Sequence, residues 1–186
     1  MCGIIGIVSS EPVADRLVDG LRRMEYRGYD SAGVCTLDDG KLIRRRAEGK
    51  LNNLVAELAA NPAPGDMGIA HTRWATHGAP TAQNAHPHAT DRVALVHNGI
   101  IENHAELREE LVAAGYQILS ATDTEVIVHL LHRELEQGAS LFAAMRTTVE
   151  RLRGAYALAA IETSNPSQVV SFIWRKAIWC RLRPPA

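Results

Sequence analysis

The second residue of the chain, Cys2, has the side chain with the most distinctive potential chemistry. If the initiator Met1 is removed, Cys2 carries both a thiol and a free α-amino group, with ordinary pKa values of roughly 8.5 and 8. An amine in this range can act as a base at neutral pH, and a thiol needs a base to become a nucleophile. The small side chain of Cys2 should permit removal of Met1. The pattern suggests an N-terminal nucleophile, with an ordinary buried cysteine as the alternative.

A thiol that attacks a carbonyl carbon also needs donors for the oxyanion and groups that hold the substrate. Asn98 and Gly99 place a side-chain amide beside an accessible backbone N–H, although Asn-Gly is also the commonest hairpin turn. Arg73 can bind a carboxylate through two parallel hydrogen bonds, and Asp123 can bind an ammonium. Together they match the two charges of an α-amino acid. The alternatives are a surface ion pair for Arg73 and a helix cap for Asp123.

The composition is typical of a soluble globular protein. The 186 residues are 46% hydrophobic and 22% charged, with a formal net charge of -1, so we expect neither nucleic acid nor a membrane as a partner. No apolar run reaches the ~20 residues of a transmembrane helix, and the start of the chain does not resemble a secretory signal. The three cysteines show no paired spacing, so we expect a reduced, cytoplasmic chain.

Two further hypotheses are not favoured by the sequence pattern. A metal could be suggested by the histidines His71, His77, His86, His88, His97 and His104. These histidines have neither the helical HExxH spacing nor accompanying paired cysteines, so we expect no metal and no other cofactor. The isolated run Arg44-Arg45-Arg46 is short, which favours a solvated strand face over a nucleic-acid patch.

Hydrophobic periodicity predicts the elements that position these residues. Strands are expected at residues 4–8, 34–37, 41–47, 67–71, 92–97, 116–119, 156–161 and from 168 onward. Helices are expected at residues 13–24, 51–58, 105–114, 122–136 and 141–152. Thr122 and Glu125 have the spacing of a capping box at the start of the fourth helix. Because the helices come in pairs, we expect an α+β fold with mainly antiparallel pairing.

Six motifs that contain these residues follow one another along the chain. They are CGIIG at 2–6, EYRGYDSAG at 25–33, HTRWATHG at 71–78, NAHPH at 84–88, HNGIIEN at 97–103 and TDTE at 122–125. In this order they closely resemble the class II glutamine amidotransferases, which use an N-terminal nucleophile. The motifs at 25–33 and 71–78 are similar to the branch that makes hexosamines.

The resemblance implies a four-layer αββα sandwich of the N-terminal-nucleophile hydrolase type, with Cys2 at the end of a central strand. It assigns Cys2 as the nucleophile and Asn98 with Gly99 as the oxyanion hole. The side-chain amide of glutamine would become a γ-glutamyl thioester and release ammonia, and water would then free glutamate.

The resemblance also implies a binding site for glutamine. Arg73, with Thr76 and His77 nearby, would bind the α-carboxylate, and Asp123 would bind the α-amino group. The rest of the pocket would be lined by Arg27, Gly28 and Trp74. In the family, the residue at the Trp74 position helps to close the site and to gate ammonia toward a second domain.

The resemblance covers residues 1–171, which we expect to form a partial amidotransferase domain, incomplete at its C-terminus. Residues 172–186 depart from the family and are rich in tryptophan and basic residues, which suggests a frameshifted end; a genuine divergent tail is the alternative. Full-length members of the branch are expected to dimerise and to carry an isomerase half that acts on fructose 6-phosphate, which is absent here. The chain is therefore expected to be a glutaminase half, with a non-catalytic remnant or another amidotransferase branch as alternatives.

Overall fold

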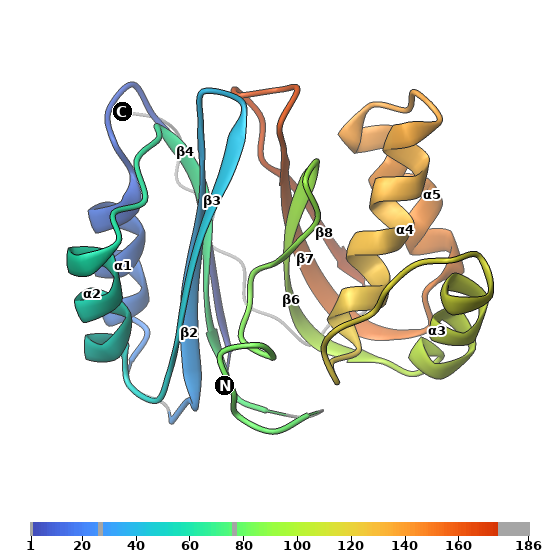
Figure 1. Ribbon diagram of the computed structural model, residues 1–186, viewed down its shortest axis with the longest axis horizontal. Helices are drawn as coiled ribbons and strands as arrows, with labels where there is room; N and C mark the ends of the chain where they lie inside the picture. Colours follow the sequence, from blue (N-terminus) through green and yellow to red (C-terminus); the bar gives the residue numbers. More distant parts are fainter. Residues whose placement is uncertain (1, 26–27, 76–77, 175–186) are drawn as a thin grey trace.

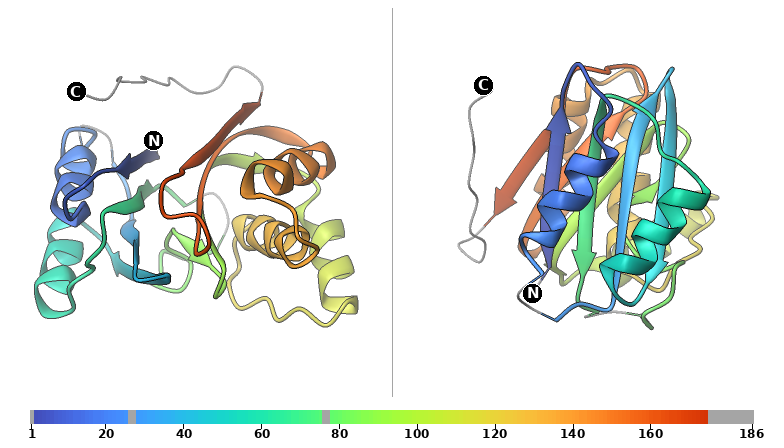
Figure 2. Two further views of the ribbon diagram at one scale, coloured as in Figure 1. Left: turned by 90° about the horizontal axis from the view of Figure 1, so that it is seen from above. Right: turned by 90° about the vertical axis from the view of Figure 1, so that its left-hand side faces the viewer.

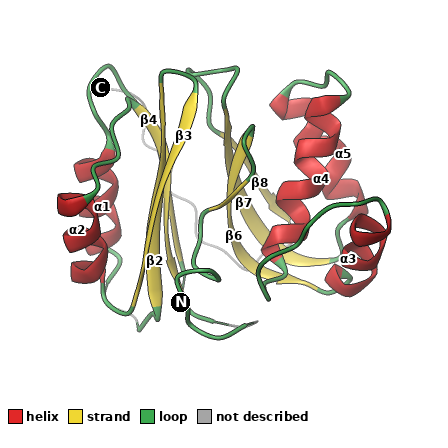
Figure 3. Cartoon of the chain, viewed as in Figure 1, coloured by secondary structure: helices red, strands yellow, loops and turns green. Residues whose placement is uncertain are grey.

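A computed structural model describes residues 2–25, 28–75 and 78–174, and these residues form four layers, with two sheets between two layers of helices (Figure 1). Each sheet has four strands, ordered β1-β4-β2-β3 and β5-β6-β7-β8, and the pairing is antiparallel throughout. In the described part of the chain, the helices lie on the outer sides of the sheets (Figure 3). The expected α+β, αββα sandwich is confirmed.

The first sheet and its helices come from the first part of the chain. Their bounds are β1 (Gly3–Val8), α1 (Ala14–Arg22), β2 (Ser31–Asp38), β3 (Lys41–Glu48), α2 (Leu51–Ala60) and β4 (Met67–Arg73). The second sheet and its helices follow. Their bounds are β5 (His88–Ala89), β6 (Val93–Ile101), α3 (His104–Ala113), α4 (Thr124–Glu136), α5 (Leu141–Arg151), β7 (Gly154–Glu162) and β8 (Val170–Trp174).

Alternating side chains of the strands build three apolar layers. In β4, Ile69 belongs to the core between the two sheets, whereas its neighbour Ala70 faces α1 and α2. This follows from the two-residue period of a strand. The second sheet packs its other face on α3, α4 and α5, with Tyr156 fully buried there. Figure 2 shows α1 and α2 lying across the outer face of the first sheet. Because β4 is covered on both sides, all its residues are buried.

The antiparallel register places the start of β1 beside the end of β4. Gly3 pairs with Thr72, and Val8 pairs with Met67. Among the described strands β1 lies at the edge of its sheet, so the expectation of a central strand is wrong. The pairing still brings Cys2, which directly precedes β1, next to the chain segment that follows β4.

Two predictions of local structure are wrong in the second half of the chain. Residues 116–119 form no strand, because the carboxylate of Glu125 accepts the backbone N–H groups of Leu119 and Ser120 at 2.9 and 2.5 Å. The same contacts remove the predicted capping box, since Glu125 is bound to these two residues. The carboxylate of Glu125 therefore accepts hydrogen bonds from the loop before α4 rather than from the first turn of its own helix.

Two of the three arginines of β3, Arg44 and Arg46, do not lie on a solvated face. Arg44 donates to the carbonyl of Pro87 at 3.4 Å, and Arg46 donates to the carbonyls of Gln83 and Ala85 at 2.9 and 3.0 Å. Burial lowers the pKa of Arg46 to about 10. These guanidinium groups hold the segment before β5 against the first sheet, which a count of charges along one strand could not predict.

Residues on both sides of the expected 171/172 boundary belong to one strand. Phe172 pairs with Leu158, and Trp174 pairs with Tyr156, so β8 continues to Trp174. Residues 175–186, which make up most of the expected tail, lie outside the described residues. No helix in the described part of the chain has the length and apolarity needed to span a bilayer.

Candidate active site

The thiol of Cys2 lies against the end of β4. Its Sγ accepts a hydrogen bond from the backbone N–H of Trp74 at 3.1 Å, and the N–H of Gly3 donates to Thr72 Oγ1 at 3.1 Å. Burial raises the pKa of the Cys2 thiol, and the Trp74 hydrogen bond offsets only part of this effect. The thiol is therefore protonated at neutral pH and needs a base before it can attack.

Asn98 and Gly99 lie inside β6, where they pair with Ala157 and Tyr156. The prediction that they close the strand, and the alternative of a hairpin turn, are both wrong. The amide Nδ2 of Asn98 donates to the carbonyl oxygen of Cys2 at 3.1 Å. Gly99 has φ 122°, and a Cβ there would lie 2.1 Å from the carbonyl oxygen of Ala155. Only glycine fits this position.

Arg73 is buried rather than exposed, so the surface ion pair is wrong. Its guanidinium lies 3.7 Å from a carboxylate oxygen of Asp30 and donates to the carbonyls of Gly78 and Ala79 at 3.2 and 3.3 Å. Asp30 also accepts the backbone N–H of Ala75 and, at 3.0 Å, the hydroxyl of Ser31. Asp30 thus anchors the segment after β4, although the sequence showed it only as part of a motif.

The carboxylate of Asp123 is also buried. Asp123 occupies the position before α4, but its side chain makes no capping hydrogen bond to the helix, so the helix-cap alternative is wrong. Instead, Oδ2 accepts the backbone N–H of Ile101 at 2.9 Å, and Oδ1 lies 3.8 Å from His97 Nδ1. The carboxylate therefore joins α4 to the end of β6, the strand that carries Asn98.

Comparison with known proteins now decides the family. Residues 71–172, more than half of the chain, match the glutamine amidotransferase domain family. The chain belongs to this family. The match includes the segments that contain Arg73, Asn98 and Asp123, and it supports the resemblance drawn from the six motifs.

Curated relatives that match the domain are isomerizing glutamine–fructose-6-phosphate aminotransferases. The domain is 57% identical over 171 residues to an isomerizing glutamine–fructose-6-phosphate aminotransferase of Rhizobium meliloti (strain 1021), covering 92% of this chain and 28% of that relative. It is 61% identical over 159 residues to the enzyme of the same name from Brucella suis biovar 1 (strain 1330), covering 86% and 26%. The chain thus spans less than a third of the length of these relatives.

A solved structure supports the fold. The glutamine phosphoribosylpyrophosphate amidotransferase from B. subtilis, complexed with ADP and GMP, superposes with a TM-score of 0.74 and 26% identity, covering 88% of this chain and 35% of that one. The amidotransferase domain is therefore an N-terminal-nucleophile type of αββα fold, as its motifs predict.

Trp74 and Gly28 of the domain lie together. The indole is 54% exposed, and a Cβ at Gly28 would come within 2.6 Å of its ring. A side chain at position 28 would displace the indole, so the sequence places glycine where the ring needs room. Arg27, Thr76 and His77, the other predicted pocket residues, lie outside the described residues.

Four histidines of the domain are buried behind the candidate site, namely His71, His86, His88 and His97. Burial lowers the pKa of His71 and of His88 to about 3, and it lowers the pKa of His86 well below its ordinary value. Residues 2–25, 28–75 and 78–174 contain no group of three or more His, Cys, Asp or Glu placed to hold a metal ion. Sequence reasoning assigned no role to these rings.

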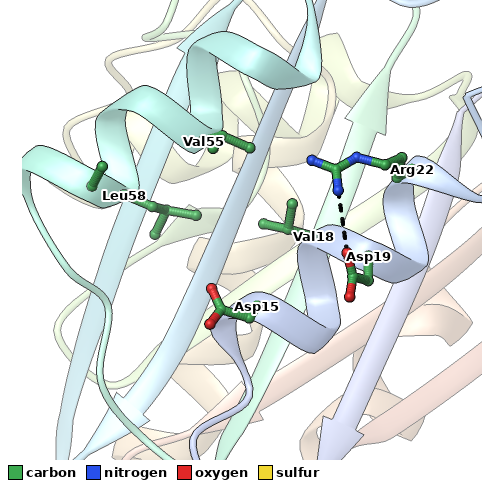
Figure 4. Close-up of a pocket in the computed structure, with 7 residues that line it drawn as sticks. Asp15, Val18, Asp19, Arg22, Val55 and Leu58 are labelled. Atoms are coloured by element: carbon green, nitrogen blue, oxygen red, sulfur yellow. Dashed lines mark hydrogen bonds and ion pairs between the residues drawn. The ribbon is translucent and has the colours of Figure 1, made fainter.

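A surface groove of about 440 Å³ lies between α1 and α2, away from the residues discussed above (Figure 4). Its lining includes Val18, Val55 and the exposed ion pair between Arg22 and Asp19, 3.4 Å apart. None of the predicted site residues lines this groove, so it does not bear on the chemistry of Cys2.

Proposed function

We propose that the chain hydrolyses glutamine to glutamate and ammonia through a thioester on Cys2, as the glutaminase part of a glutamine–fructose-6-phosphate aminotransferase. The observation that supports this most strongly is the contact between the Asn98 amide and the Cys2 carbonyl at 3.1 Å. This contact brings a hydrogen-bond donor of β6 to the residue that carries the thiol, which supports an oxyanion role for the amide in acyl transfer.

The first half of the reaction forms the thioester. The α-amino group of Cys2, free once Met1 is removed, accepts the thiol proton, and Sγ attacks the side-chain carbonyl carbon of glutamine. The Asn98 amide and the Gly99 N–H stabilise the negative charge on the former carbonyl oxygen. The C–N bond then breaks, the nitrogen takes the proton from the Cys2 ammonium, and ammonia leaves.

The second half regenerates the thiol. The Cys2 amine accepts a proton from water while the water oxygen attacks the thioester carbon. The C–S bond breaks, Sγ recovers a proton, and glutamate leaves. The same donors serve both halves because both pass through an oxyanion at one position.

The charged groups supply the binding of the amino acid. Arg73 is proposed to bind the α-carboxylate and Asp123 the α-ammonium, because both charges are buried, where an ion pair with the substrate is strongest. Trp74 is proposed to cover the bound substrate. The remaining pocket residues are proposed to be Arg27, Gly28, Thr76 and His77.

Several properties are proposed from the names and length of the relatives. The amidotransferase domain would comprise residues 1–171 together with residues 172–174, which belong to β8, so that a separate tail would begin only after Trp174 rather than at the expected residue 172. Ammonia would be passed to fructose 6-phosphate by an isomerase half that this chain does not include, in a cytoplasmic dimer. The glutaminase reaction itself requires neither of these partners.

The proposed function is tested by measuring glutamate release from glutamine with the Met1-trimmed chain and with Cys2→Ala. We expect release that depends on Cys2, with the circular dichroism spectrum unchanged by the substitution. Equal release by Cys2→Ala would exclude Cys2 as the nucleophile. No release from the folded, trimmed chain would support the alternative of a non-catalytic remnant.

A further inference from the structure

A continuous series of buried polar contacts joins Asp123 to Asn98. His97 Nδ1 lies 3.8 Å from Asp123 Oδ1 and 2.9 Å from Thr124 Oγ1. The Thr124 hydroxyl is also 2.7 Å from His86 Nε2. His86 Nδ1 lies 3.2 Å from His71 Nδ1, and His71 Nε2 lies 2.7 Å from Asn98 Oδ1. Each of these side chains except Asn98 is less than a tenth exposed.

The hydrogens of this series must all point the same way. The carboxylate of Asp123 lies 3.8 Å from His97 Nδ1, beyond hydrogen-bond distance, but its negative charge favours a hydrogen on that nitrogen, and this hydrogen is directed at the Thr124 hydroxyl 2.9 Å away. The Thr124 hydroxyl then accepts from His97, and its single hydrogen is donated to His86 Nε2. A neutral His86 therefore carries its hydrogen on Nδ1.

The requirement that each donor meets an acceptor also determines the other end of the series. His86 Nδ1 donates to His71 Nδ1, which leaves the hydrogen of a neutral His71 on Nε2. That hydrogen is donated to Asn98 Oδ1, and the Nδ2 of Asn98 then faces the carbonyl oxygen of Cys2, an acceptor that requires a donor there. The burial that lowers the pKa of His71 and His86 keeps both rings neutral, with one donor and one acceptor each.

A reversed series would also be complete internally, but it fails at the Asn98 end. It would turn the carbonyl oxygen of Asn98 toward the carbonyl of Cys2, so that two acceptors would face each other where the amide now donates at 3.1 Å. It would also place a lone pair of His97 toward the charge of Asp123, which is electrostatically unfavourable. The Asn98 end therefore selects one direction, and the charge of Asp123 favours the same one.

We propose that Thr124, acting through His86 and His71, is a positioning residue that holds the Asn98 amide with its N–H groups toward the reacting centre. The inference rests on the proposed function, which gives Asn98 its oxyanion role. An amide nitrogen carries two hydrogens, so one can remain on the Cys2 carbonyl while the other meets the oxyanion. The negative charge of Asp123 would favour the same direction of the series through its effect on His97.

The orientation itself is tested by nitrogen NMR of the histidine rings in the ¹⁵N-labelled chain at pH 7, assigned by single histidine substitutions. We expect a neutral His71 with its hydrogen on Nε2 and a neutral His86 with its hydrogen on Nδ1. A charged ring, or the opposite tautomer at either histidine, would overturn the proposal. Because Cys2→Ala should give the same spectrum, this result does not depend on the chain being a glutaminase.

The effect on catalysis is tested with Thr124→Val, which keeps the shape of the side chain but removes the hydroxyl, and Thr124→Ser, which keeps the hydroxyl. Removing a whole oxyanion donor costs about 10²–10³ in kcat, so we expect a loss of about tenfold or more in Thr124→Val, with KM for glutamine little changed. Thr124→Ser should retain most of the parent kcat.

Two kinetic outcomes would contradict the proposal. One is a kcat in Thr124→Val equal to that of the parent chain. The other is an equal loss in both variants, which would point to packing rather than to the hydroxyl. If Thr124→Val does not fold, Thr124→Ser must still keep both the parent kcat and the parent tautomers. Absence of Cys2-dependent turnover in the parent would refute the proposed function and leave the NMR test to decide the orientation.

Discussion

At the scale of the residue, the candidate site consists of a few buried groups whose charges and hydrogens are closely controlled. Cys2 is held by the backbone of Trp74, and burial raises the pKa of its thiol. A half-buried thiol whose pKa is raised is inert until a base reaches it. The free α-amino group therefore has as large a part in the proposed catalysis as the thiol.

A chain whose N-terminus is extended beyond Cys2 tests this role of the amine. Extension converts the amine into an amide, which is not a base at neutral pH, so we expect glutamate release to fall by about 10²-fold or more. Release is measured beside the Met1-trimmed chain, with the N-terminal residue of each confirmed by mass spectrometry. Equal rates in the two preparations would mean that another group deprotonates Cys2.

Substitution of Arg73 by lysine tests the recognition of the α-carboxylate. Arg73→Lys keeps the charge but loses the planar fork that makes two parallel hydrogen bonds, so we expect KM for glutamine to rise by about tenfold, the effect of ~1.4 kcal/mol of lost binding. Steady-state kinetics measure KM, with substitution of the exposed Arg22 (Arg22→Lys) as the matched control. An unchanged KM in Arg73→Lys would remove Arg73 from the binding site.

At the scale of the element, the site depends on how strands end and continue. β4 ends at Arg73, whereas β6 continues through Asn98 and Gly99 to Ile101. The pairing of Gly99 with Tyr156 brings the backbone of β7 so close that no side chain fits. The glycine is thus needed for strand pairing as well as for the approach of a ligand.

The two glycines Gly99 and Gly115 provide a matched pair for this argument. Both have positive φ, 122° and 91°, but a Cβ at Gly99 would meet the Ala155 carbonyl at 2.1 Å, whereas a Cβ at Gly115 meets nothing within 4 Å. We expect Gly99→Ala to lower the free energy of unfolding by about 3 kcal/mol or more and Gly115→Ala by about 1 kcal/mol. Urea denaturation measures both values. Equal losses would show that the close contact does not matter.

Much of the secondary structure could be predicted from the sequence. The positions of β1, α1, α2, β4, α4 and α5 follow from hydrophobic periodicity, to within a few residues at their ends. The prediction failed where distant segments decide the structure. Asn98-Gly99 has the local pattern of a turn, but its neighbour Ala157 lies far along the chain, and the sequence contains no local sign of this pairing.

The candidate site, like the secondary structure, could be predicted only in part from the sequence. The types of Cys2, Arg73, Asn98 and Asp123 suggested acyl transfer on an amino acid, but each residue also had an ordinary structural alternative, and it was the resemblance of the six motifs that favoured the chemistry. The series of contacts through His86 and Thr124 could not be predicted, since those residues are distant in the sequence and only the fold brings them within hydrogen-bond distance. Both residues lie in the motifs, but the sequence indicated no role for them.

At the scale of the whole molecule, the two sheets together build one site. Cys2 directly precedes β1 of the first sheet and Asn98 lies in β6 of the second, so the contact between the Asn98 amide and the Cys2 carbonyl depends on the apolar layer between the sheets. The buried histidines lie close to this junction. Their burial links the stability of the whole domain to pH.

The expected pH dependence follows from the lowered pKa values of His71, His86 and His88. The unfolded chain binds protons to these rings below about pH 6.5, while the folded chain does not until near pH 3 for His71 and His88. The free energy of unfolding should therefore fall as pH decreases from about 6.5 to 5, by up to about 1.4 kcal/mol per pH unit for each ring.

Urea denaturation at several pH values within this window measures the slope, above the range in which ordinary carboxylates titrate. His88→Gln is the matched variant, because its amide can still bond the Thr122 hydroxyl that lies 3.1 Å from His88 Nε2. Its slope should be smaller than that of the parent chain. A parent slope near zero, or no difference between the two chains, would contradict the buried neutral rings.

The proposed function depends on a covalent glutamyl intermediate on Cys2, which mass spectrometry can detect directly in the Met1-trimmed chain quenched in acid during turnover of glutamine. We expect a mass increase of one glutamyl group, located on the N-terminal peptide, removed by hydroxylamine and absent from Cys2→Ala. Turnover without an adduct under conditions that trap thioesters, or an adduct at another residue, would contradict the proposed function.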